Sequence, residues 1–267
     1  MIRINGNDID IGSFPDGTVS VKCDPQPYIK AGYAKLTWKY ENDRELLALI
    51  YIVKHLRSHG INTIYLYMPY IPNARMDRVK NPEDVFTLKY FAEILNSLNL
   101  TQIEVFDPHS SVSEALIDHL YIYSPQPYIL AAIDKFKSSS KNDLIMFYPD
   151  EGAGKRYSGM IQLPYSFGIK RRNWETGVIE GLDVAGAVDQ IAGKDILIVD
   201  DICSRGGTFY HSAKKLKELG AKDIYLFVSH CEDTILEGEL LEGDLIKRVY
   251  TTGSIFTKSH EKVEVLK

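Results

Sequence analysis

The sequence predicts an α/β protein of two lobes, each a mostly parallel sheet flanked by helices. Strand-like runs rich in β-branched and aromatic residues alternate with runs in which apolar residues recur at helical spacing. A Pro-containing stretch over residues 123–127 interrupts this alternation near the middle of the chain, and the alternation then resumes. We therefore divide the chain into an N-terminal lobe, residues 1–125, and a C-terminal lobe, residues 126–267.

The first lobe is expected to contain a buried strand over residues 61–69, with a helix before it. Asn42 and Glu45 have the spacing of a capping box, and apolar residues follow at helical spacing. Gly60 is a typical end for that helix.

A second helix is expected to follow, beginning at Asn81 and Pro82. Asn81 is a favoured N-cap residue, and proline is favoured at the first helical position. The apolar residues at helical spacing, which we expect to be buried, are Val85, Leu88, Phe91, Leu95 and Leu98. A short strand from Gln102 to Asp107 comes next.

The second lobe repeats this order of elements. A helix is expected from about Gly207 to Leu219, with Gly220 ending it. The strands are expected at Leu144–Tyr148, Asp195–Asp200 and Asp223–Val228.

Composition excludes several functional classes. The chain has 31 basic and 36 acidic residues among 267, so its net charge of −5 does not favour nucleic-acid binding through bulk charge. It has no run of about 18 apolar residues, so neither a membrane span nor a signal peptide is expected. The cysteines form no CxxC pair, which favours a reducing, cytoplasmic setting without a zinc site. They are Cys23, Cys203 and Cys231.

Residues 198–208, Ile-Val-Asp-Asp-Ile-Cys-Ser-Arg-Gly-Gly-Thr, hold the most informative motif. A buried strand leads to Asp200 and Asp201, and a loop with two glycines then opens a helix. Backbone N–H groups at a helix N-terminus suit a phosphate, and ionised carboxylates suit the vicinal hydroxyls of a ribose because they only accept hydrogen bonds. The alternative is an acidic turn that merely caps a helix.

This segment resembles the ribose-phosphate loop of type I phosphoribosyltransferases and ribose-phosphate diphosphokinases. Five further motifs of the diphosphokinase family occur in family order. They are Gly-Ser-Phe-Pro-Asp-Gly-Thr-Val-Ser-Val at 12–21, Pro-Tyr-Ile-Pro-Asn-Ala-Arg-Met-Asp-Arg at 69–78, Asp-Pro-His at 107–109, Pro-Asp-Glu-Gly at 149–152 and Lys-Arg-Arg at 170–172. The resemblance covers almost the whole chain and implies two type I phosphoribosyltransferase-like lobes.

The resemblance implies an Mg²⁺-dependent enzyme that moves the β,γ-diphosphoryl group of ATP onto ribose 5-phosphate. It implies Mg²⁺ binding by His109 and Asp150, a catalytic clamp of Lys170 and Arg172, and a homo-oligomer in which subunits share the ATP site. The implied ATP-binding residues are Phe14, Asp16, Thr18, Arg75 and Asp77. The implied ribose and phosphate ligands are Asp200, Asp201, Ser204, Arg205, Gly206, Gly207 and Thr208.

Each of these residues also has a structural interpretation. Taken alone, Phe14 suits a core position, His109 a surface or core histidine, and the basic run at 170–172 a solvated stretch. Arg205 likewise has two interpretations: it could bind a phosphate, or it could form a surface ion pair with a nearby carboxylate.

The ribose loop departs from the family pattern, because Ser204-Arg205 replaces the usual Asp-Thr. The change raises the local charge by about two units and favours a 5′-diphosphate, since arginine binds phosphate oxygens bidentately. A second candidate function is therefore diphosphoryl transfer to a 5′-substituted ribose such as ADP-ribose, in NAD salvage. The sequence also leaves open a phosphoribosyltransferase and a non-catalytic nucleotide sensor.

Overall fold

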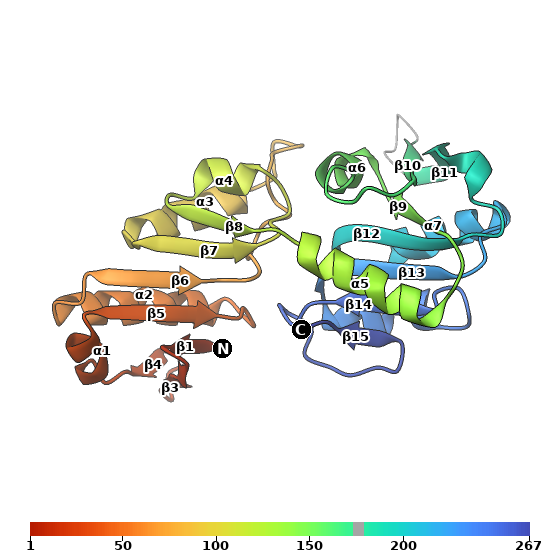
Figure 1. The fold of residues 1–267 in the computed structure, drawn as a ribbon. Coiled ribbons are helices and arrows are strands. Elements are labelled where there is room, and N and C mark those ends of the chain that lie inside the picture. The colour runs from red at the N-terminus through yellow and green to blue at the C-terminus, as the bar shows by residue number, and fades with distance from the viewer. Residues whose placement is uncertain (173–178) are drawn as a thin grey trace. The chain divides into compact units, whose positions relative to one another are not determined.

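The computed structural model describes residues 1–172 and 179–267, without the side chains of residues 139, 170–172 and 179–182. The chain divides into two compact units, Met1–Ser124 and Pro125–Lys267. Each unit is an α/β unit with a mostly parallel sheet (Figure 1), so the predicted fold class is confirmed. None of the described helices is long and apolar enough to span a membrane.

The first unit contains a six-stranded sheet in the order β2-β1-β5-β6-β7-β8. Strands β5 to β8 are parallel, whereas β1 and β2 are antiparallel to their neighbours. A separate hairpin consists of β3 (Asp10–Ser13) and β4 (Val19–Lys22). The sheet strands are β1 (Ile2–Ile4), β2 (Asn7–Asp8), β5 (Tyr33–Trp38), β6 (Thr63–Tyr67), β7 (Gln102–Phe106) and β8 (Leu120–Tyr123).

One face of this sheet forms the core of the first unit with the helices. Leu36 and Leu66 are fully buried in one cluster with Ile52 of α2 and Leu95 of α3. Alternate residues of β5, β6 and β8 stay partly or largely exposed, as expected because successive strand side chains point to opposite faces. The helices are α1 (Gln26–Ala31), α2 (Arg44–Ser58), α3 (Thr87–Ser97) and α4 (Val112–Leu116).

The capping box predicted at the start of α2 is wrong. The carboxylate of Glu45 is buried and accepts hydrogen bonds from the Trp38 indole Nε1 at 2.9 Å and from the Glu41 N–H at 2.9 Å. Because Glu45 serves the indole and the preceding chain, it does not reach back to Asn42. The end of the helix near Gly60 is confirmed.

The helix start predicted at Asn81 is also wrong, because α3 begins at Thr87. The Asp84 carboxylate accepts hydrogen bonds from the backbone N–H groups of Lys80 and Asn81, at 3.0 and 2.9 Å. Those bonds close a turn where a helix was expected, so Val85 is exposed rather than buried.

The second unit contains a seven-stranded sheet in the order β11-β10-β9-β12-β13-β14-β15. Its strands are parallel except for β11, which is antiparallel to β10. The strands are β9 (Leu144–Tyr148), β10 (Tyr165–Arg172), β11 (Ile179–Gly186), β12 (Asp195–Cys203), β13 (Ile224–Cys231), β14 (Arg248–Thr251) and β15 (Val263–Val265).

Two clusters of buried residues form the core of the second unit. Helix α7 packs through Phe209 and Leu216 against Ile196 of β12, whereas α5 and α6 share the other cluster with Val199. The helices are α5 (Gln126–Ser139), α6 (Glu151–Tyr157) and α7 (Gly207–Glu218), with short 3-10 turns at Val188–Gln190, Asp233–Glu237 and Glu239–Leu241. The predictions of β9 and α7 are confirmed, and β13 lies within one residue of its expected start.

Candidate functional site

The two adjacent carboxylates lie inside β12, which runs three residues beyond its expected end. Pairing with β9 stops at Ile198, but pairing with β13 continues to Cys203. The chain is therefore extended at Asp200 and Asp201, so their side chains point to opposite faces of the sheet. Asp201 is buried, whereas Asp200 is partly buried.

The charges around Asp200 favour its neutral form. Burial raises the pKa of Asp200 well above its usual range, and the negative charges of Asp201 and Asp150 raise it further. The Asp201 backbone N–H acts in the opposite direction, because it donates to Asp200 Oδ1 at 2.9 Å. Asp150 is the N-cap of α6, and its Oδ1 accepts from the Ala153 N–H at 3.1 Å.

Helix α6 supplies a cation that the sequence analysis did not identify. Arg156 Nη1 lies 3.6 Å from Asp201 Oδ2, with the two side chains 24% and 6% exposed. The guanidinium also lies over the ring of Tyr157, 5.5 Å from its centroid. The available signal was the position of Arg156 on the helix that begins beside Asp150.

The loop after β12 leads into α7 with its backbone close to the neighbouring Leu240. Gly206 has a φ of +80°, and a Cβ there would lie 2.7 Å from a methyl group of Leu240. Gly207 and Thr208 follow as the exposed first turn of the helix, where backbone N–H groups lack intrahelical partners. The loop therefore exposes backbone N–H groups at the start of α7.

The other two loop residues contact a segment that follows β13. Ser204 Oγ lies 3.1 Å from Thr234 Oγ1, and Arg205 Nη2 donates to Glu237 Oε2 at 2.9 Å. Gly238 approaches so closely that an added Cβ would overlap the carbonyl oxygen of Arg205. Arg205 therefore has the surface ion pair with a carboxylate that the sequence left open as its alternative, and residues 234–238 support the loop from outside.

Three expected ATP-binding residues lie together at the turn between β3 and β4. Phe14 is exposed there, which excludes the core position it could also have taken. The Asp16 carboxylate accepts from the backbone N–H of Thr18 at 3.0 Å and from its hydroxyl at 2.7 Å. These bonds lower the pKa of Asp16 and hold the turn.

The other two expected ATP-binding residues lie in the irregular segment between β6 and α3. Arg75 is exposed, and the partly buried Asp77 lies 3.9 Å from Arg78 Nε. Both the hairpin and this segment belong to the first unit.

The expected magnesium ligands belong to different units. His109 follows β7 in the first unit, and Asp150 follows β9 in the second. No group of three or more His, Cys, Asp or Glu side chains suited to a metal ion is present in the described part of the chain. A carboxylate such as Asp150 nevertheless suits Mg²⁺ chemically, because Mg²⁺ prefers oxygen ligands, needs few of them from the protein and keeps much of its water.

The expected catalytic pair lies on β10. The backbone of Lys170 and Arg172 pairs with Leu182 and Ile179 of β11. Their side chains lie outside the described residues.

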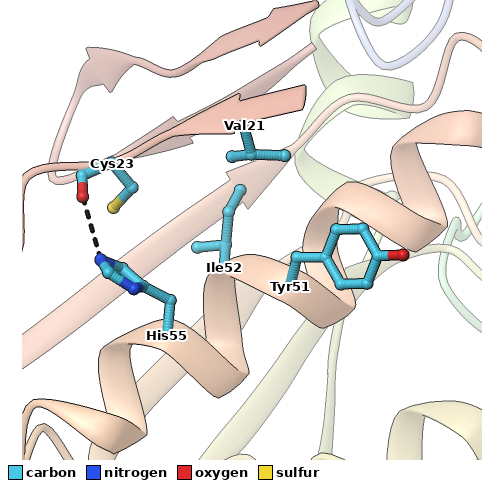
Figure 2. Close-up of a pocket in the computed structure, with 5 residues that line it drawn as sticks. All are labelled: Val21, Cys23, Tyr51, Ile52 and His55. Carbon is cyan, nitrogen blue, oxygen red and sulfur yellow. Dashed lines mark hydrogen bonds between the residues drawn. The ribbon is translucent and has the colours of Figure 1, made fainter. Parts of the chain in front are cut away.

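A pocket of about 270 Å³ lies in the first unit, away from all the expected site residues. Figure 2 shows it between the end of the hairpin and α2, lined by Val21, Cys23, Tyr51, Ile52 and His55. His55 Nε2 lies 3.1 Å from the carbonyl oxygen of Cys23. Burial raises the pKa of the Cys23 thiol, which makes it a poor nucleophile. The pocket therefore offers no activated thiol.

Comparison with known proteins shows similarity along most of the chain, although no family model matches it. It is 25% identical over 260 residues to a ribose-phosphate pyrophosphokinase of Bacillus caldolyticus, covering 95% of this chain and 80% of that protein. It is 28% identical to one from Pyrococcus abyssi, over 86% of this chain and 79% of the other. This chain is a divergent relative of the ribose-phosphate pyrophosphokinases.

The fold agrees with this relationship to the pyrophosphokinases. The phosphoribosylpyrophosphate synthetase of Mycobacterium smegmatis superposes with a TM-score of 0.79 at 19% identity. The match covers 97% of this chain and 85% of that one, so both units share the fold of that structure.

Proposed function

We propose that this protein transfers the β,γ-diphosphoryl group of ATP to the anomeric hydroxyl of ribose 5-phosphate, giving phosphoribosyl pyrophosphate and AMP. The observation that supports this function best is the pair Asp200 and Asp201 on β12, followed by the glycine-containing loop that opens α7. The pyrophosphokinase relatives match this chain over both units.

In this proposal the second unit binds the sugar phosphate. Asp200 and Asp201 accept hydrogen bonds from ribose hydroxyls, and Arg156 holds Asp201 in place. The loop Ser204–Thr208 binds the 5′-phosphate through backbone N–H groups and the Ser204 and Thr208 hydroxyls. The loop needs little rearrangement, because residues 234–238 already support it.

Magnesium is the implied cofactor and ATP the co-substrate. When bound, Mg²⁺ neutralises phosphate charge, and Asp150 with His109 would hold it, either directly or through water. Oxygen Oδ1 of Asp150 also accepts from the Ala153 N–H, which fixes this carboxylate at the start of α6.

The remaining roles concern the nucleotide and the transferred group. Phe14, Asp16 and Thr18 on the hairpin would bind ATP together with Arg75 and Asp77. Lys170 and Arg172 would stabilise the charge on the diphosphoryl group during transfer, which is mainly a matter of position and electrostatics. We further propose that the protein works as a cytoplasmic homo-oligomer whose subunits share the ATP site, and the free thiols of all three cysteines are consistent with a reducing setting.

The test separates AMP from ADP after the protein is mixed with ATP, Mg²⁺ and ribose 5-phosphate. We expect AMP, and we expect Asp201→Asn to abolish it while the exposed control Asp244→Asn leaves it unchanged. Release of inorganic diphosphate without ATP would instead indicate a phosphoribosyltransferase. ATP binding without turnover would indicate a nucleotide sensor.

A second acceptor is supported by the position of Arg205. The side chains of Arg205 and of its ion-pair partner Glu237 are both exposed, so an incoming diphosphate can replace that carboxylate at small cost. We propose a 5′-substituted ribose such as ADP-ribose as this second acceptor. The test measures AMP formation with ribose 5-phosphate and with ADP-ribose, in the unsubstituted protein and in Arg205→Thr. Only the rate with ADP-ribose should depend strongly on Arg205.

A further inference from the structure

We propose that Arg44 and His55 on α2 are positioning residues for ATP, because they hold the β3–β4 hairpin in place at both of its ends. The turn of this hairpin carries Phe14, Asp16 and Thr18, to which the proposed function assigns ATP binding. This inference therefore rests on the proposed function and adds the residues that orient the nucleotide side of the site.

The β3–β4 hairpin needs support from outside its own two strands. It forms a separate two-stranded sheet and pairs with none of the other described strands. An isolated two-stranded hairpin is marginally stable at best in water. Ile11 and Val21 pair across the hairpin and are only partly buried against the core of the first unit. Since a pocket of about 270 Å³ lies between Val21 and α2 (Figure 2), apolar packing alone does not fix the hairpin on the helix.

Arg44 holds the end of the hairpin that leads into the turn. Its Nη2 donates to the carbonyl oxygen of Gly12 at 3.2 Å and to the hydroxyl oxygen of Ser13. Ser13 pairs with Val19 and directly precedes Phe14. The N–H donors of a guanidinium have a fixed geometry, so two acceptors on one nitrogen restrict the direction of the chain as well as its distance. Arg44 therefore sets where the turn begins.

His55 holds the opposite end of the hairpin. Its Nε2 lies 3.1 Å from the carbonyl oxygen of Cys23 (Figure 2). Because a carbonyl oxygen only accepts hydrogen bonds, this nitrogen carries the proton and donates it. Cys23 directly follows Lys22, which pairs with Asp10 at the end of the hairpin far from the turn.

The spacing of the two side chains on α2 matches the length of the hairpin. Arg44 and His55 are eleven residues apart, which is about three turns, so they lie on the same face of the helix about 16 Å apart. From Ser13 to the level of Cys23 the hairpin covers four residue steps, or about 14 Å. One rigid helix can therefore hold both ends, and it fixes the tilt of the hairpin and with it the place of Phe14.

The test variants are Arg44→Met and His55→Leu, which remove the donors but keep an apolar side chain. The matched control is Arg57→Met on the same helix. Arg57 Nη2 also donates to a backbone carbonyl, that of Leu98 at 2.9 Å, but this bond does not involve the hairpin. Hydrogen–deuterium exchange of the amides of residues 10–22 reports the attachment. AMP formation at varied ATP and varied ribose 5-phosphate reports the positioning.

We expect faster exchange of the hairpin amides in Arg44→Met and His55→Leu, and unchanged exchange there in Arg57→Met. The KM for ATP should rise about tenfold in Arg44→Met, which loses bonds from a charged group, and about threefold in His55→Leu. The KM for ribose 5-phosphate and kcat should stay within about twofold of the unsubstituted protein, since those contacts lie elsewhere. Arg44→Lys and His55→Gln keep a donor and should recover part of the affinity for ATP.

Two results would overturn the inference while the protein is active. Unchanged hairpin exchange in both variants contradicts the attachment, and faster exchange with an unchanged KM for ATP contradicts the positioning role. If the unsubstituted protein binds ATP but forms no AMP, only the proposed function fails. Calorimetric titration with ATP then takes the place of KM, and the dissociation constant should rise in the same order. A protein that binds no ATP refutes both the proposed function and the positioning role.

Discussion

Replacing Gly238 by alanine should damage the sugar-phosphate loop from outside. The backbone of Gly238 has a φ of −103°, which alanine adopts without strain, so only contact decides the outcome. An added Cβ would overlap the Arg205 carbonyl oxygen and lie 2.9 Å from its carbonyl carbon. Favourable carbon–carbon contacts are about 3.5–4.0 Å, so one of the two segments must move by more than about 0.6 Å.

The size of the effect follows from that displacement. Overpacking of this kind costs about 1–3 kcal/mol of folding stability. A shift of about 1 Å in a positioning loop can lower activity by about a hundredfold. We therefore expect Gly238→Ala to raise the KM for the sugar phosphate strongly and to lower Tm, while the KM for ATP changes little.

The assay is AMP release at varied sugar phosphate and varied ATP, alongside thermal unfolding. Gly159→Ala is the matched control, because an added Cβ there meets nothing within 4 Å and the residue has no positive φ. If Gly238→Ala behaves like Gly159→Ala in both KM values and in Tm, the support assigned to residues 234–238 is wrong.

Three further predictions concern the carboxylates and the metal. Arg156→Met removes this partner from the buried Asp201 carboxylate and should lower the free energy of unfolding, measured in urea, by about 1–3 kcal/mol. The loss should be smaller than for a fully buried ion pair because Arg156 is partly exposed. Arg156→Lys should recover part of it. Asp200 has a raised pKa, so the folded chain keeps a proton that the unfolded chain releases, and stability falls as pH rises above the usual carboxyl range. Asp200→Asn should therefore melt above the unsubstituted protein at neutral pH, with the gap closing near pH 4 in thermal scans, and should lose activity. Chelation of Mg²⁺ should abolish AMP formation, and added Mg²⁺ should restore it.

The parts of the site that were predictable from sequence have local signals. Asp200 and the loop to Thr208 are contiguous, and the glycine with a φ of +80° follows a strand and opens a helix, as its position indicated. The alternation of strands and helices likewise predicted the two α/β units. In each case the forces that decide the conformation act between neighbours in the chain.

Most of the errors and omissions depend on side-chain contacts that a helix or strand pattern does not record. Glu45 has the spacing of a capping box, but the Trp38 indole competes for its carboxylate. Arg156 reaches Asp201 and Glu237 reaches Arg205 through tertiary packing, so sequence alone could not identify either residue as the partner. The helix start at Asn81 failed for a local reason, since Asp84 offered the same N–H groups a different partner.

The carboxylates of β12 also explain why ligands should stabilise this chain. Burial and the neighbouring charges of Asp201 and Asp150 work against the ionised form of Asp200, which costs folding free energy at neutral pH. Ribose hydroxyls would donate to these oxygens, and a bound Mg²⁺ would offset their charge. A ligand that binds only the folded state raises stability by mass action, and here it also relieves an existing cost. Thermal unfolding should therefore shift upward with sugar phosphate and Mg²⁺ together, and the shift should shrink in Asp200→Asn, where that cost is already absent.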